Sequence, residues 1–228
     1  MSKQDTPNQP DTAETAINPM DFSKSIQMLY PTPIIRHHFD DLEGVNAEIR
    51  DLLLAKEKEH PEWRTGAAQK SNVAGWRSRD DLLKWEDPNI NKVVDRLVNA
   101  IAFLNANRPM KKGTKQNNMD VFGWANINRT GQYNTAHIHP GYHWGAVYYV
   151  TTGKPDETLA KNGMLEFHDP RPAAAAMAVP GYEFGNKFDV RPKAGTLVVF
   201  PAWLTHAVHP FFGEEERISI AFNVRVRP

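Results

Sequence analysis

The stretch NTAHIHPGYHWGAVYYV, residues 134 to 150, places three histidines within seven positions and then runs into an apolar, β-branched and aromatic segment. The whole chain has only nine histidines. His137 and His139 are separated by one residue, and on an extended segment such residues point to the same side. We therefore expect this pair to converge on one point, with a strand following directly after it.

The residues around this stretch predict a mainly β fold. After about residue 117 the apolar pattern changes from helical to extended, and glycine and proline clusters separate short β-rich runs. These runs are DVFGWANI, WGAVYYVTT, MLEFHD, KFDVRP, GTLVVFPAW and RISIAFNVRV. Several short strands within about 110 residues favour an antiparallel barrel or jelly roll.

Two amphipathic helices are predicted before the strands, packed outside one sheet. The first covers residues 44 to 59 and has an apolar stripe formed by Val45, Ile49, Leu52 and Leu53. Its opposite, charged face carries Glu48, Lys56 and Glu57. In the second, Asp87 can cap the first turn and Pro88 suits it. Its stripe consists of Ile90, Val93, Val94, Leu97, Ile101 and Leu104, and the helix should end before residue 107.

The domain organisation follows from composition. Residues 1 to 20 are polar and should form a flexible tail, because they offer little apolar surface to bury. Residues 21 to 228 should form a single domain, with a helical N-terminal part up to residue 116 and a barrel from residue 117. The alanine-rich RPAAAAMAVPGYEFG is expected to be a loop or a short helical lid.

Composition also narrows the class of protein. The chain has 27 basic and 27 acidic residues, so no overall field favours nucleic acid or anionic lipid, and we expect neither as a partner. It contains no cysteine, which excludes disulfides and thiolate ligands and is compatible with a reducing compartment. The N-terminus lacks the apolar core of a signal peptide, and no window resembles a membrane span. We therefore expect a cytoplasmic protein.

A metal site is the main functional prediction. A third imidazole would come from His206 in FPAWLTHAVHP, which follows another β-rich run. Three neutral imidazoles leave open positions on a divalent ion such as iron, copper, nickel or zinc. We expect His143 to have a structural role and His209 to lie behind the ligands or at the surface, and His168 could line the cavity. The three remaining histidines, His37, His38 and His60, are assigned to the helical part and to no site.

The order of these features resembles the 2-oxoglutarate/Fe(II) oxygenase superfamily, especially its prolyl-4-hydroxylase-like branch. It is closer still to a group of uncharacterised bacterial 2-oxoglutarate/Fe(II) oxygenases. The segments that carry the resemblance are YPTPII, SNVAGWRS, WANIN, HIHPG, GAVYYV, GMLEFHDPR, GTLVVFPAWLTHAVHP and RISIAFN. They cover most of the chain from residue 30 onward, so the resemblance extends well beyond one motif.

The resemblance implies a double-stranded β-helix in which a His-x-Asp or His-x-Glu pair and a distal histidine hold iron. It assigns the first ligand to His137, the distal ligand to His206, and the far carboxylate of 2-oxoglutarate to Arg217, at the head of the last strand. Weaker assignments for contacts with the co-substrate are Tyr149, Asn126 and Asn128. The chain departs from the pattern at the middle ligand, where His139 replaces the carboxylate. This puts the use of 2-oxoglutarate in question.

The leading hypothesis is an Fe(II)- and 2-oxoglutarate-dependent dioxygenase that uses O2 to hydroxylate a small molecule or a peptide side chain. Apolar walls of its pocket would come from Trp144, Phe167, Phe200 and Trp203. Two alternatives stay open: a cupin-like three-histidine enzyme that needs no oxoacid, and a non-catalytic metal- or ligand-binding barrel. A second subunit could cover the edge of the barrel.

Overall fold

The computed structural model describes residues 23–25, 30–63, 71–107, 118–171 and 187–227. The chain separates into two compact units, Met1–Pro31 and Thr32–Pro228. In the first unit the described residues form one 3₁₀ turn, Ser23–Ser25. All helices and strands discussed below belong to the second unit. The predicted tail and most of the alanine-rich segment lie outside the described residues.

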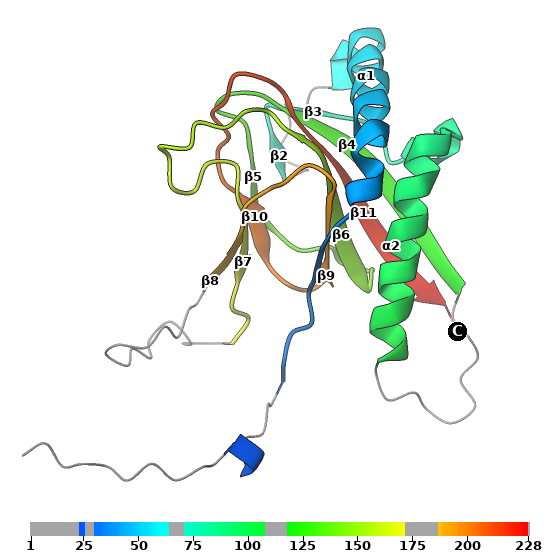
Figure 1. Ribbon diagram of the computed structural model, residues 1–228, viewed down its shortest axis with the longest axis vertical. Coiled ribbons are helices and arrows are strands. Elements are labelled where there is room, and N and C mark those ends of the chain that lie inside the picture. The colour runs from blue at the N-terminus through cyan, green and yellow to red at the C-terminus, as the bar shows by residue number, and fades with distance from the viewer. Residues whose placement is uncertain (1–22, 26–29, 64–70, 108–117, 172–186, 228) are drawn as a thin grey trace, which may run out of the picture. The chain divides into compact units, whose positions relative to one another are not determined.

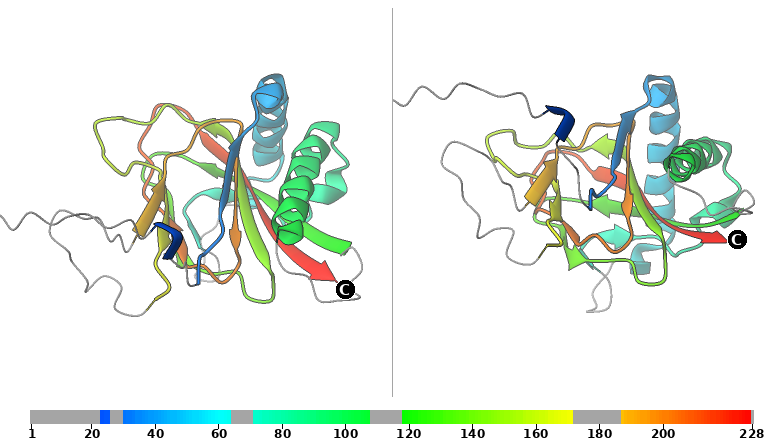
Figure 2. Two further views of the ribbon diagram at one scale, coloured as in Figure 1. Left: turned by 60° about the horizontal axis from the view of Figure 1, so that its bottom comes forward. Right: turned by 90° about the horizontal axis from the view of Figure 1, so that it is seen from below.

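Two antiparallel sheets face each other in the second unit (Figures 1 and 2). The larger sheet has the order β1-β9-β6-β11-β4-β3 and the smaller one the order β2-β5-β10-β7-β8. The strands of the larger sheet are β1 (Ile35–His38), β3 (Trp76–Arg77), β4 (Asn118–Asn128), β6 (Trp144–Thr152), β9 (Thr196–Pro201) and β11 (Arg217–Arg227). The strands of the smaller sheet are β2 (Asn72–Val73), β5 (Tyr133–His137), β7 (Leu165–His168), β8 (Lys187–Val190) and β10 (His206–Val208).

Two helices, α1 (Glu43–Glu59) and α2 (Pro88–Ala106), cover the outer face of the larger sheet (Figures 1 and 2). Both lie where the sequence predicts them. Asp87 caps α2 as expected, because its Oδ1 accepts the backbone N–H groups of Asn89 and Ile90, each at 2.9 Å. The shorter 3₁₀ turns are Asp40–Leu42, Pro61–Trp63 and Leu82–Trp85. Among the described residues, no helix is both long enough and apolar enough to cross a bilayer.

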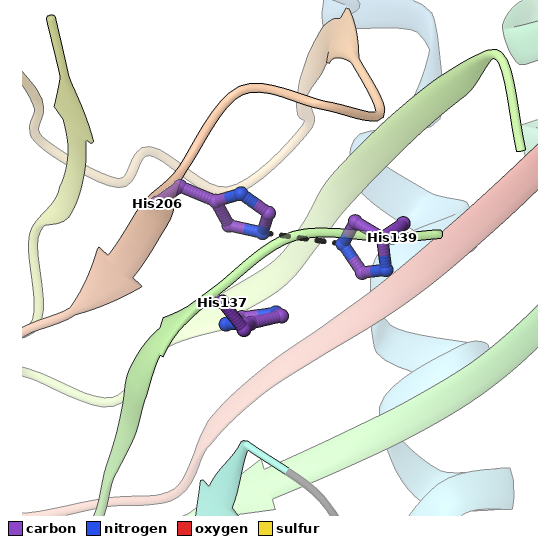
Figure 3. Close-up of side chains that lie close together, drawn as sticks. All are labelled: His137, His139 and His206. Atoms are coloured by element: carbon purple, nitrogen blue, oxygen red, sulfur yellow. Dashed lines mark hydrogen bonds between the residues drawn. The ribbon is translucent and has the colours of Figure 1, made fainter. Parts of the chain in front are cut away.

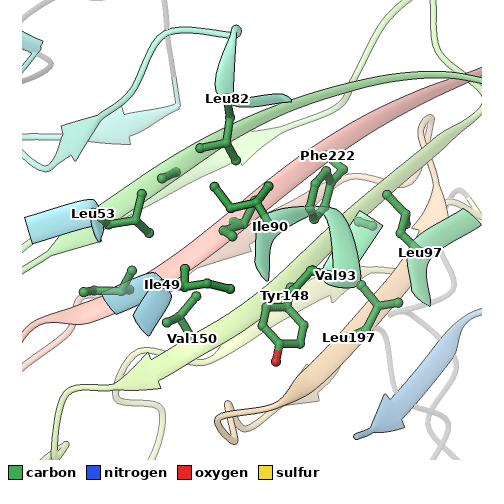
Figure 4. Packing of buried hydrophobic residues seen from close by; sticks show 14 of the residues in the cluster. Ile49, Leu53, Leu82, Ile90, Val93, Leu97, Tyr148, Val150, Leu197 and Phe222 are labelled. Atoms are coloured by element: carbon green, nitrogen blue, oxygen red, sulfur yellow. The ribbon is translucent and has the colours of Figure 1, made fainter. Parts of the chain in front are cut away.

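The alternation of the strands divides the side chains of the larger sheet between two environments. One set faces the helices and forms the main core with them (Figure 4). On α1 and α2 this core includes Ile49, Leu53, Ile90, Val93, Leu97 and Ile101, and on the sheet it includes Tyr148, Val150, Leu197, Ile218, Ile220 and Phe222. The other set faces the smaller sheet, where Tyr149, Val198 and Phe200 pack with Leu165, Phe167 and Val190. The space between the sheets is therefore the interior of the barrel.

Two expectations about the N-terminal part need correction. It is not only helical, because β1, β2 and β3 all precede residue 117 and add strands to both sheets. His37 and His38 consequently lie in a strand. Glu57 is not on an exposed face: it is 8% exposed, and its carboxylate accepts two hydrogen bonds from Arg129, at 2.6 and 2.8 Å. This paired geometry offsets the cost of burying the charge, which sequence periodicity alone does not reveal.

Candidate metal centre

The pairing of β5 with β10 brings His137 and His206 together. They are directly opposite each other in the antiparallel ladder of the smaller sheet, although 69 positions separate them in the sequence. Their ring centroids lie 4.2 Å apart. Neighbouring side chains on one face of an antiparallel pair are in contact. The distal histidine predicted from the sequence thus lies beside the first one (Figure 3).

His139 reaches the same point from beyond the end of β5 rather than from within a strand. Its backbone N–H donates to the carbonyl oxygen of Ala202 at 2.8 Å. The N–H of Ala202 in turn donates to the carbonyl oxygen of His143, four residues after His139, at 3.0 Å. The His139 ring is packed tightly, because a Cβ built on Gly145 would lie 2.6 Å from the Phe200 ring and 3.2 Å from His139 Cδ2. A side chain at residue 145 would displace both rings.

The hydrogen bonds of two rings fix which nitrogens face the centre. His137 Nδ1 lies 2.7 Å from the carbonyl oxygen of Thr135, and His206 Nδ1 lies 2.8 Å from that of Leu204. A carbonyl oxygen only accepts, so both Nδ1 atoms carry protons, and in the neutral rings both Nε2 atoms keep a lone pair. Backbone partners of this kind orient metal-binding histidines.

The spacing of the donor atoms also fits one ion. His139 Nε2 lies 3.2 Å from His206 Nε2 (Figure 3), and one nitrogen from each of the three rings lies within 4.8 Å of the others. Two nitrogens that bind one ion at right angles, each at about 2.1 Å, are about 3 Å apart. Three imidazoles with open coordination positions are a suitable donor set for Fe(II).

Burial keeps the three rings neutral. It lowers the pKa of His206 to about 3, with a further contribution from His137. Burial, His137 and Arg77 together lower the pKa of His139 to about 4, and burial lowers that of His137 as well. A lowered pKa means that the ring is unprotonated at neutral pH, which is the form that binds a metal.

Other histidines have structural partners. His143 Nδ1 accepts the backbone N–H of Val226 at 3.0 Å, in agreement with its predicted structural role. His209 and His168 contact the carboxylate of Glu166 at 3.0 and 3.1 Å. His168, which could have lined the cavity, is therefore engaged elsewhere, while His209 fits its prediction.

Glu166, Asp189 and His209 form a second group with metal-like spacing. Its charge is already compensated, because Lys187 and Lys161 donate to Glu166 at 2.6 and 2.9 Å. Lys161 also lies 3.2 Å from Asp189. Two ammonium groups already bind the oxygens that a cation would need as ligands. This group is therefore an ion-pair cluster, whereas no such cation contacts the histidine triad among the described residues.

A narrow cavity of about 60 Å³ lies inside the barrel and is lined by the triad together with Arg217 and Tyr149. Arg217 is 2% exposed, and its guanidinium lies 5.3 Å from the centre of the Tyr149 ring. Among the described residues, neither Arg217 Nε nor the Tyr149 hydroxyl has a hydrogen-bond partner. Burial raises the pKa of Tyr149, and the charge of Arg217 partly opposes this. A buried cation without a carboxylate partner is costly and calls for an anionic ligand.

The remaining predicted site residues divide into two sets. Asn126 lines the cavity, and its Oδ1 accepts from Asn72 at 3.1 Å. Asn128 points instead to Asn72, whose Oδ1 accepts from it at 3.3 Å, and it does not line the cavity.

Of the four predicted wall residues, Phe200 lines the cavity, and Phe167 packs against it at 5.0 Å. Trp144 packs against the helix-side core and Trp203 is 53% exposed, so both predictions are wrong. The position of Trp144 follows from the alternation of β6, which places it on the same face as Tyr148.

Sequence reasoning missed the residues that shape a second, outer cavity of about 250 Å³. Among them are Arg77 and Trp124, from β3 and β4. The two cavities share His137 and His139, so they meet at these two rings, while His206 lines the inner cavity. The signal available in the sequence was the alternation of β4, which places Phe122, Trp124 and Asn126 on one face.

Residues 123–223 match the model of a family described as "Putative 2OG-Fe(II) oxygenase". This segment is similar to that family over 101 of the 228 residues. The match confirms the predicted family and class of enzyme, a 2-oxoglutarate/Fe(II)-dependent dioxygenase, with Fe(II) as cofactor and 2-oxoglutarate as co-substrate. No curated protein matches the sequence.

Solved structures share the fold. A prolyl-4-hydroxylase from Pseudomonas putida is 17% identical, with a TM-score of 0.55 over 86% of this chain and 94% of its own. HygX from Streptomyces hygroscopicus, solved with nickel and 2-oxoglutarate, is 12% identical, with a TM-score of 0.52 over 85% of this chain and 83% of its own. A prolyl hydroxylase from Trichoplax adhaerens, in complex with a hypoxia inducible factor peptide fragment, is 11% identical, with a TM-score of 0.53 over the same shares, 85% and 83%. These likenesses confirm the predicted double-stranded β-helix.

Proposed function

We propose that His137, His139 and His206 hold the Fe(II) of this dioxygenase, and that Arg217 binds the far carboxylate of 2-oxoglutarate. The observation that carries the proposal is one narrow cavity lined by both the triad and the buried Arg217, whose Nε has no hydrogen-bond partner among the described residues. A cupin-like enzyme without an oxoacid would give no reason to bury an arginine there. A purely structural ion would likewise give no reason to bury an arginine beside it.

The protein's own groups would perform the following tasks. The carbonyl oxygens of Thr135 and Leu204 hold two imidazoles in the tautomer that presents Nε2. Arg217 offers a planar set of donors that match a carboxylate through parallel hydrogen bonds. The Tyr149 hydroxyl, also without a partner among the described residues, is available to the same ligand. Phe200 and Phe167 exclude water from the inner side.

Bound Fe(II) would supply the oxidative chemistry, with O2 and 2-oxoglutarate as oxidant and co-substrate. The reaction we propose is hydroxylation of a C–H bond in a small molecule or a peptide side chain. Ligands of both sizes occur among the structural relatives: HygX was solved with hygromycin B bound, and the Trichoplax prolyl hydroxylase in complex with a peptide fragment. We also propose a cytoplasmic location, because a chain without cysteine is compatible with a reducing compartment.

The test is succinate formation by anaerobically prepared protein after addition of Fe(II), 2-oxoglutarate and O2, together with 2-oxoglutarate affinity. Arg217→Ala should abolish measurable 2-oxoglutarate binding while metal content stays near that of the wild type. Arg225→Ala is the matched control, because Arg225 lies on the same strand but is exposed. Unchanged 2-oxoglutarate affinity in Arg217→Ala would refute the role given to this arginine.

A further inference from the structure

The outer cavity adjoins the inner one, and among its lining residues it adds the charged side chains of Arg77 and Asp80. Its walls carry the aromatic side chains of Phe122, Trp124 and Tyr142 together with several amide groups. The amides belong to Asn72, Asn126, Asn134 and Asn223. The Oδ1 of Asn223, a residue only 9% exposed, has no hydrogen-bond partner among the described residues. A ligand with several polar groups would satisfy this surface better than a hydrocarbon.

Arg77 is the cation of this cavity, and the alternation of β3 places it there. Trp76 faces the helix-side core, so the next residue points into the barrel. The Arg77 guanidinium lies 4.4 Å from the centre of the Trp124 ring, and its side chain is only 9% exposed. Stacking on an aromatic face holds the guanidinium in a defined orientation.

Most of the donors on Arg77 remain available. Nη1 donates to the carbonyl oxygen of Ser78 at 3.0 Å, and Nη2 donates to Asp80. A guanidinium has five N–H groups, and among the described residues these are the two bonds that Arg77 makes. Asp80 itself is largely in solvent, with its side chain 59% exposed. The guanidinium thus keeps an unused donor edge in the cavity.

The cavity suits a monoanion better than a dianion. Arg77 is the one arginine or lysine and Asp80 the one carboxylate among the lining residues that the structure describes. A single guanidinium that already has one carboxylate partner suits a second carboxylate. It suits a phosphate dianion less, because no second cation of the described lining would balance the extra charge.

We propose that the outer cavity binds the substrate to be oxidised, that this substrate is a small organic carboxylate bearing further polar groups, and that Arg77 binds its carboxylate. This inference rests on the proposed function for the identity of the neighbouring triad. The volume of about 250 Å³ limits the ligand to a small molecule such as a free amino acid. Arg77 is therefore a specificity-determining residue.

The test measures binding of matched probes to the Fe(II)-loaded protein, kept anaerobic and saturated with 2-oxoglutarate. The probes are free amino acids and other small carboxylic acids, each paired with its primary carboxamide. We expect at least one carboxylate to bind the wild type more tightly than its carboxamide. That carboxylate should bind Arg77→Gln at least about tenfold more weakly. Arg79→Gln is the matched control, since Arg79 also lies over a tryptophan ring, that of Trp63, at 5.3 Å, but outside the cavity.

A second variant changes the affinity in the opposite direction. Asp80→Asn removes the carboxylate that competes for Arg77, so the same probe should bind several-fold more tightly. The inference is overturned if no carboxylate in the panel is preferred over its carboxamide. It is also overturned if Arg77→Gln retains wild-type affinity, or if Arg79→Gln loses as much as Arg77→Gln. Binding of 2-oxoglutarate to the wild type, Arg77→Gln and Arg217→Ala is measured separately, so that failure of the co-substrate site is distinguished from failure at Arg77.

Discussion

The side chains of the candidate metal centre are positioned mainly by the backbone. Carbonyl oxygens two residues upstream orient His137 and His206, and the backbone bonds of His139 hold its loop against residue 202. These arrangements need no carboxylate in the first shell. At the residue scale, the replacement of the expected acidic ligand by His139 therefore leaves a complete set of donors with three neutral rings.

His206→Ala tests the triad against a histidine in a different role. Loss of one of three ligands should lower bound iron from about one ion per chain to a small fraction. His143→Ala is the control, because His143 belongs to the same histidine-rich stretch but bonds the backbone of Val226. Metal analysis of the anaerobically loaded proteins gives the stoichiometry. Full iron content in His206→Ala would place the ion elsewhere.

At the scale of single elements, the alternation of each strand determines the environment of its side chains. In β6, Tyr148 faces the helices and donates to Asn46 Oδ1 at 2.7 Å, whereas Tyr149 faces the cavity. The sequence predicts the strand correctly, and the family resemblance selects Tyr149. The sequence does not show which of Asn126 and Asn128 lines the cavity, because both point to the same side of β4. Only their different contacts with Asn72 distinguish them.

The two tyrosines should respond differently to loss of the hydroxyl. Tyr148→Phe should lower the free energy of unfolding by about 1 kcal/mol, because it removes a buried hydrogen bond and leaves the Asn46 oxygen without its donor. Its affinity for 2-oxoglutarate should be unchanged. Tyr149→Phe should weaken 2-oxoglutarate binding while stability stays within about 0.5 kcal/mol of the wild type, since its hydroxyl has no partner among the described residues. Urea unfolding and equilibrium binding check both effects. Weaker 2-oxoglutarate binding by Tyr148→Phe, with lower stability of Tyr149→Phe, would contradict the geometry.

At the scale of the whole molecule, the sequence predicts the mainly β class, both helices and most of the long strands. It fails where contacts distant in sequence decide the outcome. The two-residue strands β2 and β3 have too little pattern to detect, yet they carry Asn72 and Arg77 to the outer cavity. Likewise, no periodicity indicates that Lys161 and Lys187 would converge on Glu166 and occupy the second metal-like cluster.

The Glu166 cluster should make stability depend on pH. Burial alone would raise the pKa of Glu166, but hydrogen bonds from Lys187, Lys161 and His209 lower it well below its usual value of 4.5. A lowered pKa in the folded protein means that the stabilisation is fully present above about pH 4.5 and is lost as the pH falls further. Glu166→Gln should therefore destabilise the protein at pH 7 by about 1 to 3 kcal/mol, allowing for the half-exposed lysines.

The difference between the wild type and Glu166→Gln should shrink as urea unfolding is repeated at decreasing pH below 4.5. Glu59→Gln is the control, because Glu59 pairs with Lys56 at the surface and should change stability little. A difference that stays constant down to low pH would show that the carboxylate charge of Glu166 is not what stabilises the cluster.

Anomalous diffraction at the iron edge, on crystals grown anaerobically with Fe(II), tests the metal assignment most directly. We expect one strong anomalous peak, about 2.0 to 2.2 Å from a ring nitrogen of each of His137, His139 and His206. A peak at Glu166, Asp189 and His209 instead, or an iron position that leaves the three imidazoles unbound, would contradict it.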